Sequence, residues 1–259
     1  MAIKAGPNLV RSGLALYLDA GAAASYSGSG TAWNDLSGNN NHFTLYNSPT
    51  YNSSFGGELR FDGTNDYARN RNNTIINNIA SFGTVEIWYR TYDGVLGGLN
   101  YSRLISVAND TGTGSDSTST QGTNNDFSTF FCLARNNGTN YYNIWYKSNP
   151  GPFGGTTTYN DNIYRQIVMS WSTDVWTPAM TFTHYINAVS QVSTTYNGQT
   201  PYSGANNITI GMNCLGAISN TGTETNKGAY SIVRLYSKTL SQAEITQNYN
   251  ATKSRFNLI

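Results

Sequence analysis

The sequence predicts an all-β protein, an antiparallel two-sheet jelly-roll sandwich with one short C-terminal helix. Apolar and polar residues alternate in many short segments, and turns rich in glycine and asparagine separate these segments. Aromatic residues make up 13% of the chain and charged residues only 11%, which favours strands joined by turns over helices. No linker divides the 259 residues, so we expect an N-terminal arm of residues 1–12 and a single domain of residues 13–259.

The predicted strands follow one another along the whole domain. Leu14, Leu16 and Leu18 indicate the first strand, because they alternate with Ala15 and Tyr17. Further strands are expected at residues 44–46, 58–61, 84–92, 101–107, 126–133, 141–147, 164–171, 179–186, 189–192, 207–212 and 229–236. The arm that precedes them is expected to be either disordered or docked on a neighbouring subunit.

The last predicted strand leads into a segment with helix signals. Ser241 is suited to cap a helix, and Glu244 stands three residues later, where its carboxylate can bond back to the Ser241 amide. Leu240 and Ile245 can form an apolar contact across this cap. We therefore expect a helix of roughly three turns that ends near Asn250.

One acidic loop raises the question of a bound metal ion. Asp62, Asn65 and Asp66 are close in sequence and are candidate ligands for Ca²⁺, which takes oxygen ligands in a loose shell. The pair Asp62–Gly63 is also a strong signal for a hairpin turn between strands. We favour the structural turn, which needs no cofactor, and keep calcium as the alternative.

Four segments of the chain carry a family resemblance. They are GLALYLDAG at residues 13–21, WNDLSGNNNHF at 33–43, LRFDGTNDYA at 59–68 and the C-terminal stretch at 228–256. In this order they resemble the concanavalin A-like lectin/glucanase superfamily, in the laminin-G-like branch found in bacteriophage virion proteins. The resemblance implies that the first and last strands lie near each other and close one sheet.

The same resemblance implies the leading functional hypothesis. It is a non-enzymatic virion surface protein of a tailed bacteriophage, either a capsid decoration or a fibre component. Such a protein would be made in the host cytoplasm and located on the virion surface, with other virion proteins as its partners. We expect it to be oligomeric or bound to a repeated lattice, with the N-terminal arm as an anchor.

The strand expected at residues 84–92 argues against catalysis. Its odd-numbered residues are expected to face the core and its even-numbered residues to face outward. Glucanases of the superfamily carry their acids on one strand as Glu-x-Asp-x-x-Glu, but here Glu86 is followed by Trp88 and Thr91 at the two acidic positions. Glu86 is instead expected to pair with Arg90 or with a partner on a neighbouring strand. The sequence therefore predicts that the protein is not an enzyme.

An exposed aromatic platform would favour an alternative function, a carbohydrate-binding adhesion module that recognises host cell-surface glycan. Sugars stack their apolar faces on aromatic rings, and nearby Asn and Asp side chains bind their hydroxyl groups. The candidate glycan-binding residues are Trp88, Tyr92, Tyr141, Trp145 and Trp176. We expect at least one of these rings to be exposed.

Charge and apolar patterning exclude two classes of partner. The formal net charge is only +1 and the basic residues are scattered, so we expect no nucleic-acid partner. No stretch approaches the ~20 apolar residues of a membrane span, so no membrane association is expected. Cys132 and Cys214 are expected to be buried thiols, and His184 is expected to be a half-exposed strand residue and not a catalytic base.

Overall fold

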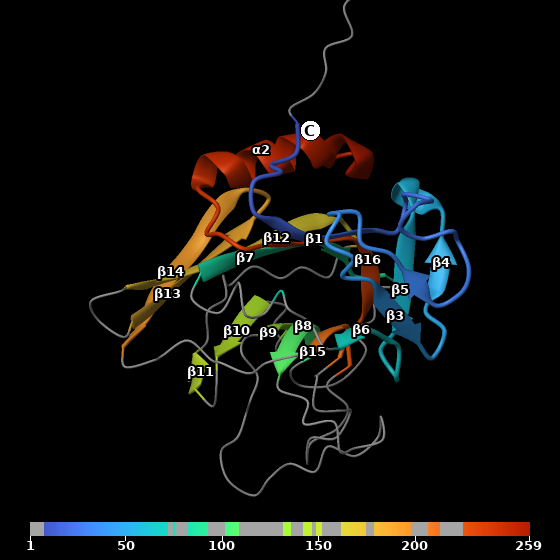
Figure 1. The fold of residues 1–259 in the computed structure, drawn as a ribbon, viewed down its shortest axis with the longest axis horizontal. Coiled ribbons are helices and arrows are strands. Elements are labelled where there is room, and N and C mark those ends of the chain that lie inside the picture. The colour runs from blue at the N-terminus through green and yellow to red at the C-terminus, as the bar shows by residue number, and fades with distance from the viewer. Residues whose placement is uncertain are drawn as a thin grey trace, which may run out of the picture.

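The computed structural model describes residues 8–71, 75, 82–92, 102–108, 132–135, 142–146, 149–151, 162–174, 179–197, 207–212 and 225–259. These residues form two antiparallel sheets that face each other, and one α-helix packs on the outer side of one sheet (Figure 1). The arrangement confirms the predicted two-sheet sandwich with its C-terminal helix.

Sheet A is the sheet that carries the helix. Its strands are β1 (Leu14–Asp19), β4 (Thr50–Asn52), β5 (Glu58–Asp62), β7 (Phe82–Arg90), β12 (Arg165–Asp174), β13 (Ala179–Ile186), β14 (Val189–Asn197) and β16 (Lys227–Tyr236). Their order is β14-β13-β12-β7-β16-β5-β4, and β1 pairs with β16. Leu16 lies opposite Leu235 and Leu18 opposite Val233, so the first and last strands are neighbours, as the family resemblance implied.

Sheet B lies on the other side of the core. Its strands are β2 (Ala32–Trp33), β3 (Phe43–Tyr46), β6 (Tyr67–Arg71), β8 (Ser102–Ala108), β9 (Cys132–Arg135), β10 (Tyr142–Tyr146), β11 (Asn149–Gly151) and β15 (Asn207–Ile210). Their order is β11-β10-β9-β8-β15-β6-β3-β2. The first part of the strand expected at residues 126–133 lies outside the described residues, which resume at β9.

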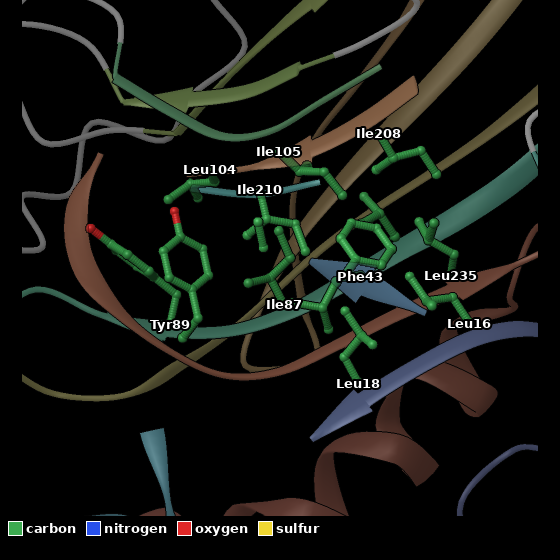
Figure 2. Close-up of a cluster of buried hydrophobic side chains, with 14 of the residues drawn as sticks. Leu16, Leu18, Phe43, Ile87, Tyr89, Leu104, Ile105, Ile208, Ile210 and Leu235 are labelled. Atoms are coloured by element: carbon green, nitrogen blue, oxygen red, sulfur yellow. The ribbon is translucent and has the colours of Figure 1, made fainter. Parts of the chain in front are cut away.

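The hydrophobic core fills the space between the two sheets. Val85, Ile87 and Tyr89 of β7 are buried in it, which confirms that the odd-numbered residues of this strand face inward. Sheet B contributes Ile105 of β8 and Ile210 of β15, which lie near Ile87 and Tyr89 in Figure 2. On the opposite face of β7, Thr84, Glu86, Trp88 and Arg90 are also buried, and Glu86 and Trp88 contact the helix.

The helix α2 (Gln242–Thr252) begins at the predicted cap. The Ser241 side chain accepts a hydrogen bond from the Glu244 amide, and the Glu244 carboxylate accepts one from the Ser241 amide. Leu240 and Ile245 are buried in one apolar cluster, as expected for the contact across the cap. The capping prediction is confirmed.

The helix ends later than the sequence pattern indicated. It continues past Asn250 to Thr252 and leads into a 3₁₀ turn, η2 (Lys253–Phe256), which contacts a second such turn, η1 (Ser54–Gly56). The helices in the described part of the chain are too short or too polar to cross a membrane.

Residues 8–12 of the N-terminal arm pack on the helix of their own chain. The Val10 amide donates to Asn248 Oδ1 at 2.9 Å, and the Tyr236 hydroxyl donates to the Val10 carbonyl at 3.3 Å. Val10 is buried between α2 and sheet A. For these residues the expectation of a disordered or neighbour-docked arm is wrong, because Val10 fills an apolar site within the chain.

The Asp62–Gly63 turn is not a hairpin. It joins β5 of sheet A to β6 of sheet B, so it carries the chain from one sheet to the other. Asp62 Oδ1 accepts a hydrogen bond from the Thr64 amide at 2.7 Å, and Gly63 has a φ of 78°. The local turn signal was correct, but β5 and β6 lie in different sheets and therefore do not pair.

Candidate functional site

A layer of polar side chains is buried between α2 and the outer face of sheet A. Glu86 of β7 lies at its centre and is 1% exposed. Its Oε1 accepts from Arg234 Nη1 at 2.7 Å, from Trp88 Nε1 at 3.0 Å and from Gln166 Nε2 at 3.1 Å. Its Oε2 accepts from Asn248 Nδ2 of the helix at 2.9 Å. The charge of Glu86 is therefore balanced by the guanidinium of Arg234 and stabilised by three further hydrogen bonds from neutral side chains.

Glu58 of β5 occupies a second, equally crowded position. It accepts from Arg90 Nη2 at 2.6 Å and Nε at 2.9 Å, from Arg60 Nε at 2.8 Å and from the Tyr164 hydroxyl at 2.7 Å. Burial alone would raise the pKa of Glu58, but the hydrogen bonds from Arg90, Tyr164 and Arg60 outweigh burial and lower it. Glu58 is therefore held as a carboxylate.

These contacts decide between the two partners expected for Glu86. Arg90 pairs with Glu58, whereas Glu86 pairs with Arg234, which lies directly opposite it on the neighbouring strand β16. The partner of Glu86 is thus across the sheet and not on its own strand. A general acid needs a raised pKa, whereas the pKa of Glu58 is lowered by its hydrogen bonds.

A polar cleft of about 290 Å³ opens beside this layer. The residues that line it come from the N-terminal segment, from β1, from β16 and from the junction of α2 with η2. The polar side chains among them include Arg11, Tyr17, Asp19, Arg234 and Arg255. The cleft therefore joins chain segments that lie far apart in the sequence.

Asp19 and Arg255 form one wall of the cleft. Arg255 Nη1 donates to Asp19 Oδ1 at 2.7 Å, and the Tyr17 hydroxyl donates to Asp19 Oδ2 at 3.1 Å. The rest of the Arg255 guanidinium is bonded to the carbonyls of residues 55–57 and to Ser231 Oγ. This wall is therefore fixed by its own hydrogen bonds.

Arg234 forms the deep end of the cleft, since it is 2% exposed. Its guanidinium lies over the Tyr17 ring, 4.8 Å from the ring centre. Burial alone would lower the pKa of Arg234, but Glu86 and then Tyr17 raise it, so the group stays charged. A half-buried tyrosine and a buried cation thus share the floor of the cleft.

Trp88 is not part of an exposed platform, and this prediction is wrong. It is 0% exposed and stacks against Phe256 of η2, with ring centres 4.6 Å apart, and against Tyr249 of α2 at 5.9 Å. The outward face of β7 is covered by the helix, so an outward position on this strand is still an interior position.

The other predicted aromatic residues have different settings. Tyr92 is half-buried, and its hydroxyl donates to the Phe61 carbonyl at 2.9 Å. Its ring centre is 5.4 Å from Arg60 Cζ and 5.5 Å from Lys227 Nζ. Trp145 lies in β10, where only its main chain is described. Tyr141 and Trp176 lie outside the described residues.

The three calcium candidates lie together at the turn between the sheets. Asp62 Oδ1 accepts from the amides of residues 64 and 65, and Asp66 Oδ2 accepts from the Asp62 amide at 3.0 Å. Burial, with a further contribution from the Asp62 charge, raises the pKa of Asp66 to about 6. The Asn65 carbonyl accepts from Asn47 Nδ2 at 2.7 Å. These contacts are those of a hydrogen-bonded turn, and calcium remains the alternative.

His184 is fully buried, which corrects the expectation of a half-exposed residue. It occupies the same face of β13 as Met180 and Phe182, both of which belong to the core. Burial lowers the pKa of His184 to about 4, so its ring is neutral at physiological pH.

Comparison with known proteins identifies the fold. No family model and no curated protein matches the sequence. A sialidase of Trypanosoma rangeli solved with the inhibitor DANA is 14% identical, with a TM-score of 0.61 over 94% of this chain and 34% of that one. The binding domain of botulinum neurotoxin DC in complex with SialylT is 11% identical, with a TM-score of 0.62 over 93% of this chain and 52% of that one. The fold is similar to the lectin-like two-sheet sandwich of these proteins.

At such identities the likeness extends to the fold alone. A third neighbour, described as HCR/D W1238A mutant, gives the same picture, with 14% identity and a TM-score of 0.63. This chain spans between one third and about one half of the length of these neighbours. Any activity or ligand named for them belongs to those larger proteins.

Sequence reasoning missed the residues of the cleft. The signal for Arg234 was present, since a charged residue within the run Ile232 to Tyr236 of a central strand needs a buried partner. No comparable signal marked Tyr17, Asp19 or Arg255, because each lies in a segment that is unremarkable by itself. They meet only through the pairing of β1 with β16 and the packing of η2.

Proposed function

We propose that the protein is a non-enzymatic carbohydrate-binding module. The polar cleft is the observation that carries this proposal. It surrounds the half-buried Tyr17 with hydroxyl, carboxylate and guanidinium groups, which are the groups that bind sugar hydroxyls beside an aromatic ring. A volume of about 290 Å³ lies near the lower end of ligand sites and suits one sugar unit of a longer glycan.

The non-enzymatic part of the proposal is supported by the state of the carboxylates. Glycosidases need two carboxyl groups on either side of the bond they cleave, one of them as an acid. Asp19 is bonded to Arg255 and to the Gly21 amide at 2.9 Å, and Glu86 lies behind Arg234. Each of these carboxylates is paired with an arginine.

The structural neighbours support glycan as the ligand class. One was solved with sialic acid and another with SialylT. A host cell-surface glycan is the corresponding ligand for this chain, and an adhesion module is the corresponding role.

Retention on polysaccharide tests the proposal. Purified protein would be passed over immobilised bacterial surface polysaccharides, and released reducing sugar would be measured in parallel. We expect saturable retention without release of sugar. Release of sugar that persists after repurification would show an enzyme, and lack of retention on every polysaccharide would refute glycan binding.

A second proposal is that this module is displayed on the surface of a tailed bacteriophage. It is supported by the four sequence segments that resemble virion proteins, not by the structural neighbours. Other virion proteins would then be its partners, and it would be oligomeric or lattice-bound. Light scattering on the purified protein at about 100 µM checks the self-associating form, with a defined oligomer expected and a strict monomer contradicting it.

A further inference from the structure

The polar cleft has more positive than negative charge. Three arginines line it, and the carboxylates that neutralise them are Asp19, paired with Arg255, and Glu86, paired with Arg234. Arg11 is exposed at the rim and makes no ion pair with any residue in the described part of the chain. One positive charge is therefore left over at the mouth of the cleft.

The deep end of the cleft has unused hydrogen-bond donors. A guanidinium has five N–H donors, and buried donors are costly to leave without an acceptor. Within the described residues, Arg234 Nε has no hydrogen-bond partner, and Nη2 has only a long contact of 3.4 Å to Thr252 Oγ1. Nε is itself buried, so Nη2 is the group that can donate to a ligand in the cleft while Nη1 keeps its pair with Glu86.

The charge balance selects the type of anion. A carboxylate carries one negative charge, which matches the single unpaired arginine, and its two oxygens match the fork of a guanidinium. A phosphate monoester carries nearly two charges, and the second would lie unpaired near Asp19. The single surplus positive charge in the cleft therefore favours a carboxylate ligand over a phosphate ligand.

We propose that the polar cleft binds the carboxylate of an acidic sugar, with Arg234 at the deep end and Arg11 at the rim as its cationic partners. This inference rests on the proposed carbohydrate-binding function and narrows its ligand to a uronic acid type of unit. The Tyr17 ring lies beside Arg234 and offers a face for the sugar ring.

Nuclear magnetic resonance of the ¹⁵N-labelled chain tests the proposal at a single atom. D-galacturonate would be titrated while the assigned Nε–H signal of Arg234 is followed, with D-galactose and inorganic phosphate as comparison probes. We expect a saturable shift with galacturonate, little response to galactose and weaker binding of phosphate.

Variants at exposed arginines distinguish specific binding in the cleft from nonspecific attraction to the positive charge of the protein. Arg11→Gln removes the rim charge and is expected to weaken galacturonate binding about threefold to fivefold, the range of an exposed ion pair. Arg71→Gln is the matched control, because Arg71 is also exposed but lies on β6 of sheet B, and it should leave the affinity unchanged. Arg234→Lys keeps the charge that Glu86 needs but removes the fork, so binding should fall while the fold is retained. If that variant does not fold, the effect of Arg11→Gln on galacturonate affinity still tests the proposal.

Each result has a distinct meaning. Equal binding of galactose and galacturonate, unaffected by Arg11→Gln, would overturn the acidic-sugar inference and leave carbohydrate binding intact. Phosphate binding as tightly as galacturonate would also overturn it, since the cleft would then be a general anion site. If no probe shifts the Arg234 signal, the inference fails, and retention on polysaccharide still tests the proposed function independently.

Discussion

Replacing Glu86 with glutamine probes the layer between α2 and sheet A. The change keeps the size of the side chain and removes its charge. Arg234, which is 2% exposed, would then be a buried cation without its counter-ion. The new amide nitrogen would also meet only donors, because Trp88, Gln166 and Asn248 all donate to this carboxylate.

The expected loss of stability is large for a single isosteric substitution. Removing one partner of a buried ion pair costs about 3–5 kcal/mol in the free energy of unfolding. Guanidinium denaturation followed by tryptophan fluorescence should show a lower transition midpoint with an unchanged slope.

The matched control is Glu244→Gln in the partly exposed capping box. It should cost about 1 kcal/mol or less, because an exposed charge is screened by water. A loss below about 1 kcal/mol for Glu86→Gln, or a loss equal to that of Glu244→Gln, would refute the reasoning that the Glu86–Arg234 pair is a desolvated and essential contact.

Three further predictions concern stability. The pKa of Asp66 is raised to about 6 in the fold. Its favourable contribution to the free energy of unfolding is therefore present below about pH 4 and is lost as the pH rises through about 6. Asp66→Asn should stabilise the protein in thermal melts at about pH 8 and have no effect at about pH 3.5. Ser241→Ala removes the helix cap and should cost about 1 kcal/mol in urea denaturation, with no cost if the cap is not formed in solution. Gly228→Ala places a methyl group against the Tyr89 ring and should cost about 1–3 kcal/mol, whereas an unchanged melting temperature would show that Tyr89 can move aside.

Local patterns in the sequence were enough to predict most of the framework. The period-two alternation of β7 and β16, the cap at Ser241 and the clasp of Leu240 with Ile245 each depend on residues that are close in sequence. Such features are set by short-range geometry, so they can be recognised without knowing the partner elements.

Exposure was harder to predict, because it depends on what covers a face. The sequence shows that Trp88 points away from the core of the sandwich, but not that α2 and η2 cover that side. His184 was expected to be half-exposed although the sequence already indicated burial. It is two residues from Phe182 on the same strand, so both side chains lie on the core face. The cleft itself arises from segments more than 200 residues apart, and no local signal brings them together.

The pairing of β1 with β16 has a mechanical consequence. Leu14 at the start of β1 lies opposite Tyr236 at the end of β16, so the segments that enter and leave this strand pair emerge at the same edge. A load applied between these two segments would first detach Val10 from the helix. It would then break the hydrogen bonds between β1 and β16 one after another. A load applied between one of these segments and the opposite end of the strand pair would instead act along the strands and strain all of their hydrogen bonds together. A module of this design would therefore resist force best when it is tethered through one of these segments and loaded at the opposite end of the strand pair.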